Sequence, residues 1–237
     1  MSNPVLTASA PDEARYNFYH IIHKALRLGH CRMLAALGAN DFANDVTTPR
    51  LLAELRQLIV LGRSHLEGEN REIHVALEAR APGASSHAAE DHGHHEQSFA
   101  ELESLIRAVE VAVSSRRDVA GRALYRRYAL FAAADIEHMN EEETELLQAL
   151  HKAFTDEELH AIEGRIVSAI PPAKMMAYAR LMMPAINHPE RVNLLRKMQQ
   201  AMPDPAFKGL LADAVKPSLD PRDYADIMAD MMLNQAA

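Results

Sequence analysis

Apolar side chains recur every three or four residues along most of this chain, which is the spacing of one buried face of an α-helix. Gly38 and Asn40 follow the first such stretch, and Pro82 and Gly83 follow the second, so helix-ending residues separate the stretches. Four long stretches joined by short links predict an all-α fold built on an up-down-up-down four-helix bundle. The helices are expected at about residues 12–37, 48–80, 88–113 and 119–154.

The pattern changes after residue 155. Thr155 and Glu158 form a capping-box signature that predicts a fifth helix, which Pro171 and Pro172 end. Shorter helical segments between prolines are expected at about residues 173–184, 189–202, 205–215 and 221–232. The predicted parts are a disordered N-terminus at residues 1–11, the bundle at residues 12–155 and a helical extension at residues 156–237. The sequence leaves open whether the extension covers the bundle end or builds a homodimer.

Composition narrows the class of protein. The 237 residues include 9 Gly and no Trp, while Ala, Leu, Glu, Met and Arg recur, which favours helices. The one cysteine, Cys31, excludes an intramolecular disulfide, indicates a reducing compartment and is expected to be a small buried residue. No secretory signal and no run of roughly 20 apolar residues is visible, so we expect a cytoplasmic protein with no membrane partner. The net charge of -8 argues against nucleic acid as a partner.

Two of the expected helices contain the pattern His-x-x-x-Glu, as His65 with Glu69 and as His138 with Glu142. A spacing of four residues advances about 400° around an α-helix, so both members of each pair project from one face. Imidazole binds first-row transition metals, and a carboxylate can bridge two ions. One such pair is often only an ion pair, but two pairs on facing helices predict a metal centre bridged by Glu69 and Glu142.

Further nitrogen ligands would come from the other two helices, where His23 and His92 lie on core-facing positions. Together with the two His-x-x-x-Glu pairs, these histidines fill about eight coordination positions if each bridging carboxylate counts twice. Two octahedral ions need roughly twelve, so solvent, oxygen bridges or further ligands must complete them. His95 is the alternative to His92. The reserve candidates are His30, His74, His95 and Glu96.

These residues resemble the hemerythrin-like family, or HHE cation-binding domain, whose helical bundle holds a non-haem di-iron site. The similarity covers roughly residues 15–155, and it departs from the family at Gly68 and Glu141, where relatives often have a further His. The text from Phe154 to Leu159 also resembles bacterial members that carry a helical extension. The similar motifs are Ile22-His23, His65-x-x-x-Glu69 with Ile73-His74, Asp91-His92, and His138-x-x-x-Glu142-Glu143.

The resemblance implies two iron ions, although manganese or zinc would accept the same ligands. It implies a protein that binds or senses oxygen, nitric oxide or peroxide, so a small diatomic molecule or a peroxide is the expected partner. One alternative is a di-iron enzyme with peroxidase-like or oxidase activity, and another is a metal-free helical interaction protein. Ferritin-like di-iron proteins carry Glu-x-x-His and more carboxylates, so a carrier or sensor is favoured over an enzyme. The His-rich run from His87 to Glu96 could also bind metal at the surface.

Overall fold

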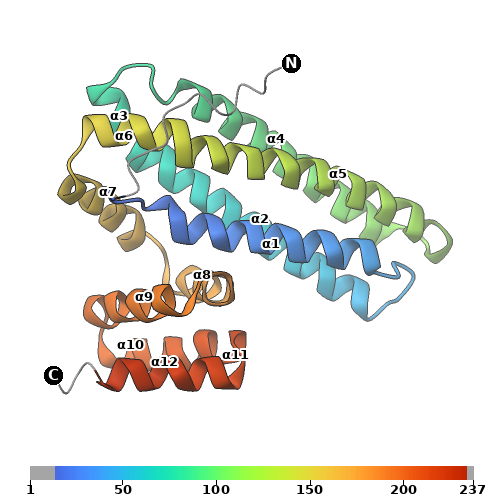
Figure 1. Cartoon of the computed structure of the whole chain (residues 1–237). Coiled ribbons are helices and arrows are strands. Elements are labelled where there is room, and N and C mark those ends of the chain that lie inside the picture. The colour runs from blue at the N-terminus through green and yellow to red at the C-terminus, as the bar shows by residue number, and fades with distance from the viewer. Residues whose placement is uncertain (1–13, 234–237) are drawn as a thin grey trace, which may run out of the picture. The chain divides into compact units, whose positions relative to one another are not determined.

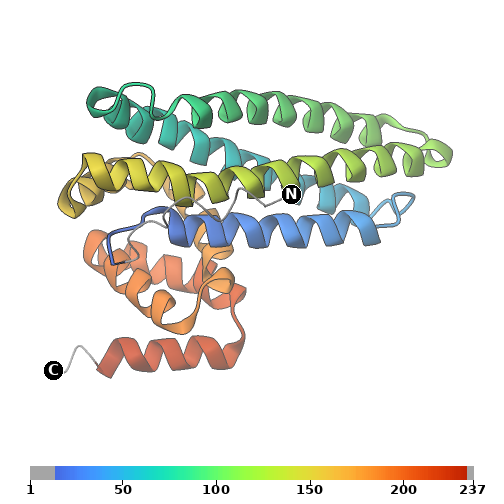
Figure 2. The ribbon, with the colours of Figure 1, turned by 45° about the horizontal axis from the view of Figure 1, so that its top comes forward.

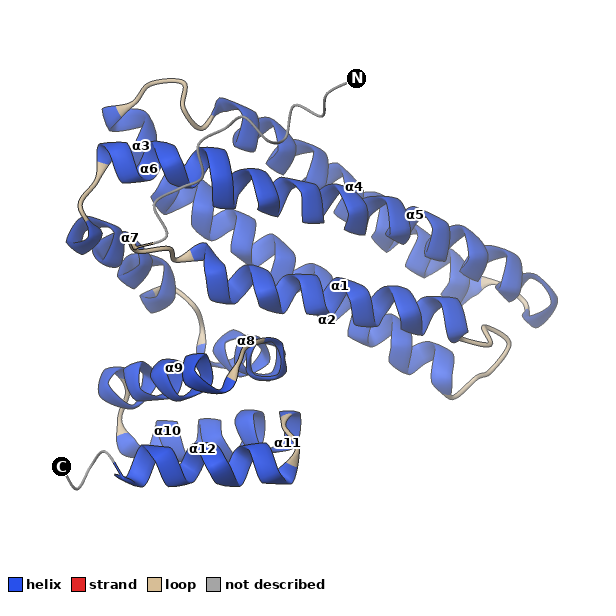
Figure 3. Cartoon of the chain, in the orientation of Figure 1, coloured by secondary structure: helices blue, strands red, loops and turns tan. Residues whose placement is uncertain are grey.

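The computed structural model describes residues 14–233, and all regular structure in that range is helical, without a β-strand (Figure 3). The all-α prediction is confirmed for this part of the chain, whereas the expected disordered N-terminus at residues 1–11 lies outside it. The described residues form two compact units, one of residues 14–20 and 29–169 and the other of residues 21–28 and 170–233. The predicted division at residues 155 and 156 stays a prediction.

Four long helical segments make up most of the first unit, apart from residues 21–28 of the first segment, which group with the second unit. Successive segments reverse direction at short loops (Figures 1 and 2). Two of them are α1 (Tyr19–Ala39) and α4 (Ser86–Val111). The second segment is α2 (Thr47–Gly68), a π-helical turn (Glu69–His74) and α3 (Val75–Arg80). The fourth is α5 (Ser114–Glu141), a π-helical turn (Glu142–Leu146) and α6 (Leu147–Ala153).

The first helix begins later than its sequence predicts. Residues 14–18 are not helical, and α1 starts at Tyr19. The side chain of Asn17 accepts hydrogen bonds from the backbone N–H groups of Tyr19 and His20, which stabilises the start of the helix at this point. The helix thus starts beside the polar side chain of Asn17, and not at about residue 12 as the sequence predicts.

Two apolar clusters lie along the long segments. One contains Leu37, Leu55, Ile106 and Tyr128, so α1, α2, α4 and α5 share a single core. The other joins residues of α3 and α6 to α7 (Asp156–Ser168). In the second and fourth segments, the chain leaves the first cluster, passes through residues 69–74 or 135–142, and then enters the second. Polar groups placed in these stretches are therefore enclosed by apolar side chains on both sides.

The later helices match the sequence prediction closely. The capping box at Thr155 and Glu158 is present at the start of α7, with both reciprocal hydrogen bonds formed. The second unit has its own core, which includes Met183, Leu195 and Ile227. Its helices are α8 (Pro172–Ala185), α9 (His188–Ala201), α10 (Asp204–Leu210), a π-helical turn (Leu211–Val215), α11 (Lys216–Ser218) and α12 (Pro221–Leu233).

Within residues 14–233, no helix combines the length and the apolar character that crossing a lipid bilayer requires.

Cys31 is exposed, so the expectation that it is buried was wrong. On α1, His30 and Met33 face the core, and Cys31 falls between them on the outer face of the helix.

Candidate metal centre

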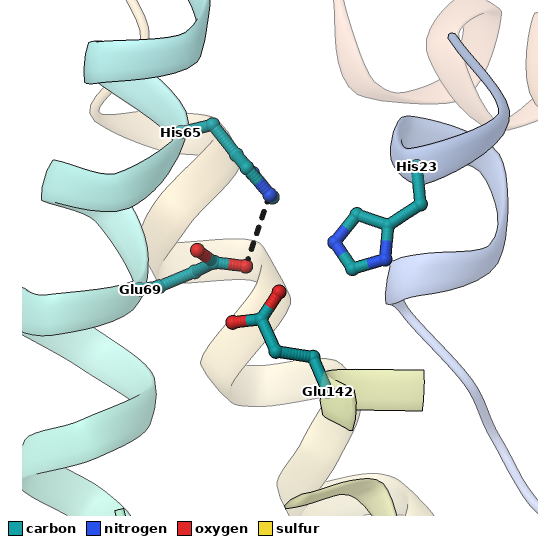
Figure 4. Close-up of side chains that lie close together, drawn as sticks. All are labelled: His23, His65, Glu69 and Glu142. Carbon is teal, nitrogen blue, oxygen red and sulfur yellow. Dashed lines mark ion pairs between the residues drawn. The ribbon is translucent and has the colours of Figure 1, made fainter. Parts of the chain in front are cut away.

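Buried imidazoles and carboxylates gather in two overlapping groups. The first consists of His23, His65, Glu69 and Glu142, and the second of His74, His92 and Glu142. Within each group, one possible ligand atom per residue lies within 4.8 Å of all the others. Figure 4 shows the first group, in which both carboxylates and the two imidazole rings point toward one another. Glu142 belongs to both groups, so they are adjacent parts of one centre.

The two oxygens of Glu69 face different histidines. Its Oε1 lies 3.1 Å from Nε2 of His65, and its Oε2 lies 3.7 Å from Nε2 of His92 (Figure 4 draws the first contact). Glu142 Oε1 lies 3.6 Å from Nε2 of His92 and 3.4 Å from Nε2 of His138. Carboxylates arranged between separate nitrogen donors can each bridge two ions.

His92 and His138 direct the same ring nitrogen into the centre. Nδ1 of His92 bonds Asn70 Oδ1 at 2.8 Å, and Nδ1 of His138 bonds Asp91 Oδ2 at 3.3 Å. An oxygen acceptor at Nδ1 keeps the proton there and leaves the Nε2 lone pair free for a metal. The two Nε2 atoms are 3.0 Å apart. Two nitrogens bound at right angles to one ion, each at about 2.1 Å, would have about this separation.

Each of the two carboxylates stands at the first residue of a π-helical turn, Glu69 in Glu69–His74 and Glu142 in Glu142–Leu146. Turns of this kind inside α-helices occur frequently at functional sites. Each histidine of the two His-x-x-x-Glu pairs precedes its turn in regular helix, so the pair still shares one face. The sequence pattern predicts regular helices through both stretches and contains no signal for either turn.

The electrostatics of the centre favour a bound cation. Burial raises the pKa of Glu69 well above its usual range, and the nearby Glu142 carboxylate raises it further. For His138, burial lowers the pKa, but the nearby carboxylates of Glu142, Asp135 and Asp91 together outweigh burial and raise the pKa to about 9. Burial, together with the adjacent His92, lowers the pKa of His74 to about 4. A divalent ion would compensate the buried carboxylates and take the place of the proton on His138.

Two reserve candidates belong to a separate buried network. His30 bonds the Tyr128 hydroxyl through Nδ1 at 2.9 Å and Asp135 through Nε2 at 2.6 Å. His95 Nδ1 lies 3.7 Å from the other Asp135 oxygen. Asp135 thus faces both histidines, and neither belongs to the two groups of the centre. The structure brings His92, and not its alternative His95, into those groups. His138 is in neither group, but its Nε2 lies 3.4 Å from Glu142 Oε1 and 3.0 Å from Nε2 of His92.

The remaining candidates lie nearer the surface. Glu96 pairs with Arg63 at 3.0 Å and is half exposed, so it stands apart from the centre. A third, solvent-exposed group consists of His87, Asp91 and Glu141, with His87 3.1 Å from Glu141. Its location matches the start of the His-rich run. Asp91 Oδ2 lies 3.9 Å from Nε2 of His87 and 3.3 Å from Nδ1 of His138, so Asp91 connects the surface group to the buried centre.

The departures from the family pattern have local explanations. A Cβ at Gly68 would lie 3.2 Å from the Ile166 Cγ2 methyl group of α7, so a side chain at this position would require Ile166 to shift. Glu141 is occupied by its ion pair with His87. The sequence named His74 only as a reserve, and it did not indicate Asn70 as a partner of His92. Asp91 was visible only as part of the Asp91-His92 motif.

Comparisons with models of protein families, with curated proteins and with solved structures found no match for this chain. The geometry shows that buried His and Glu residues from all four long segments could hold a metal ion. The function is therefore inferred from the centre itself.

Proposed function

We propose that this protein is a non-haem di-iron protein that binds or senses oxygen, nitric oxide or peroxide. The observation that carries this proposal is the sharing of Glu142 by two ligand groups, with the two oxygens of Glu69 facing His65 and His92. The first ion would be held by His23, His65 and the two carboxylates. The second would be held by His92, His138 and the same carboxylates.

We further propose a hemerythrin-like up-down-up-down four-helix bundle as its scaffold. The four long segments share one apolar core and reverse direction at short loops, as such a bundle requires (Figure 2). The order of the ligands along the chain supports the same proposal. One histidine lies on α1 and one on α4, and each His-x-x-x-Glu pair runs from the last turn of α2 or α5 into the π-helical turn that follows it.

The enclosure of the centre favours a small ligand. Glu69, His92, His138 and Glu142 are each at most 3% exposed. Apolar clusters adjoin these residues along the helices, so a diatomic molecule or peroxide has an advantage over any larger substrate. An iron pair would supply redox chemistry toward such ligands, and the protein would supply imidazoles held in orientation by Asn70 and Asp91.

Iron is proposed because of the ligand order and its resemblance to hemerythrin-like proteins, since manganese or zinc would accept the same donors. The imidazole-rich set favours a carrier or sensor over an oxidase, which would be expected to have more carboxylates. A monomer and a homodimer are both compatible with this function. A cytoplasmic location and the absence of nucleic-acid and membrane partners stay predictions.

The test is to measure iron per chain after anaerobic loading with Fe²⁺, followed by the optical spectrum with oxygen and with peroxide. We expect about two irons per chain and a spectrum that changes reversibly with oxygen, as carriers require. In Glu142→Gln, both ions should bind more weakly, because both groups lose the carboxylate that they share. His94→Gln is the matched control, since His94 is on α4 beside the centre but is largely exposed.

Three results would contradict the proposal in different ways. Full iron content in Glu142→Gln would exclude the shared carboxylate. An absence of stoichiometric iron in the wild-type protein would make the chain a metal-free helical protein. Rapid turnover of peroxide, with no reversible oxygen binding, would favour the enzyme alternative.

A further inference from the structure

His74 is a buried residue whose polar atoms lack partners. The residue is 6% exposed, and neither Nδ1 nor Nε2 has a hydrogen-bond partner among the described residues. A neutral imidazole carries one N–H donor and one acceptor lone pair, and buried groups of this kind are nearly always paired. Two unmet nitrogens on one enclosed ring therefore indicate a partner that is not part of the polypeptide.

The position of the ring points to a metal as that partner. The ring of His74 stacks on that of His92, with centroids 4.9 Å apart and planes 17° from parallel. One nitrogen of His74, one of His92 and one oxygen of Glu142 all lie within 4.8 Å of one another. Two imidazoles and a carboxylate gathered in this way form a set of donors suited to a first-row divalent ion.

The π-helical turn explains why His74 faces this way. In a regular α-helix, five residues advance about 500°, which would turn His74 about 140° away from Glu69. In a π-helical turn the bonded residues are five apart, so the fifth residue lies about one turn above the first. The turn Glu69–His74 therefore brings its last residue to the same side of the helix as its first.

The second His-x-x-x-Glu segment provides an internal comparison. Its π-helical turn starts at Glu142, and the residue five positions later is Leu147. Leu147 is buried in the apolar cluster that also contains Leu77. The same local geometry thus delivers leucine in one segment and histidine in the other, and packing alone does not require an imidazole at this position.

We propose that His74 is a ligand of the second ion, which it binds together with His92 and Glu142. This inference rests on the proposed metal centre. It adds a nitrogen donor contributed by a π-helical turn to the donors contributed by regular helix. With this donor, the second ion would have more imidazole ligands than the His-x-x-x-Glu motifs alone supply.

The test compares wild type with His74→Leu, which copies the residue found at the equivalent position of the fourth segment. His74→Gln is a second variant in case leucine hinders folding. Full-length protein is titrated with Co²⁺ alone in equilibrium dialysis. One of the two Co²⁺ ions should bind at least about tenfold more weakly in both variants. The NMR spectrum of the Co²⁺-loaded variant should contain one strongly shifted ring N–H signal fewer, which a histidine that is only a neighbour would not change.

His95→Gln is the matched control. His95 is similarly buried, its Nδ1 is also without a hydrogen bond, and its ring lies against His138, but its Nδ1 faces Asp135 at 3.7 Å and not a carboxylate of the centre. It should keep both Co²⁺ ions and all shifted signals. Unchanged Co²⁺ affinities and signals in the His74 variants, with two ions bound in wild type, would overturn the role of His74 alone. Absence of bound Co²⁺ in wild type would overturn both this inference and the proposed centre.

Discussion

In both His92 and His138, the ring nitrogen that points away from the centre, Nδ1, determines the orientation of the imidazole ring. Asn70 and Asp91 accept hydrogen bonds at the two Nδ1 atoms, so both Nε2 atoms are directed toward Glu142. Without these acceptors each imidazole could rotate or change tautomer, and its lone pair would no longer point at the ion. These two hydrogen bonds would therefore contribute to the metal affinity of the proposed centre, although Asn70 and Asp91 would not contact the metal.

Replacing Asp91 by Asn should weaken metal binding about 10–100-fold while leaving the number of ions at saturation unchanged. The reason is that Asp91 orients His138 without being a ligand of the buried centre. Glu90→Gln is the control, because Glu90 is an exposed neighbour of Asp91 on the same helix. Competition with a chelator of known affinity would measure the change. A reduced ion number in Asp91→Asn would show that Asp91 is itself a ligand.

At the residue scale, the sequence could predict contacts that depend on local helix geometry alone. His65 and Glu69 lie on one face because they are four residues apart, and the structure does place them 3.1 Å from each other. His74 could not be chosen in the same way, since a regular helix would turn it away from Glu69. Asn70 is five residues after His65, and nothing local indicates that it reaches a histidine on another helix.

At the element scale, the π-helical turns are the feature that distinguishes these helices from a regular bundle. Both begin at a carboxylate of the centre, and both pass directly into the helices α3 and α6. Propensity and periodicity describe average helices, so an extra residue in one turn leaves no trace in a pattern read over ten or more residues. Helix starts were predictable where a side chain supplies the cap, as at Thr155, and were missed at Asn17.

Helix packing in the first unit depends on a close approach at Gly121 of α5. A methyl group added there would overlap the ring of Phe42, which is itself buried in the shared core. Gly121→Ala should therefore destabilise the protein by about 1–3 kcal/mol, as overpacked cores do. Gly93 of α4 has open space around its Cβ position, so Gly93→Ala should stabilise by up to about 1 kcal/mol. Urea denaturation of both variants would measure the difference, and equal effects would contradict this view of the packing.

At the scale of the whole molecule, the sequence predicts a change from long to short helices near residue 155, and the described residues form two compact units. The change was visible because prolines shorten the later helices. The units nevertheless do not follow chain order, because residues 21–28 of α1 group with the C-terminal unit. Ile21 packs against the second core, and Lys24 pairs with Glu190 at 2.7 Å. Such long-range pairings have no signature in a linear pattern.

Removal of the metal should therefore lower the local stability of some parts of the chain more than that of others. A bound ion stabilises the folded chain by about 2.7 kcal/mol when its free concentration is 100 times its dissociation constant. Chelation withdraws this stabilisation and leaves Glu69 and Glu142 buried without a counter-charge. Hydrogen exchange with and without chelator should show faster exchange concentrated in residues 65–75 and 138–147. The helices α9 (His188–Ala201) and α12 (Pro221–Leu233) have a separate core and should change little.

Glu142→Gln is the control for the hydrogen-exchange experiment. Its exchange should respond little to chelator, because the variant already binds the ions more weakly. Equal acceleration across both units would mean that the metal stabilises the chain only as a whole. Unchanged exchange in residues 65–75 and 138–147 would mean that no ion is held between Glu69 and Glu142. Because the π-helical turns lie within these two segments, the experiment also tests whether the turns depend on the ion or persist without it.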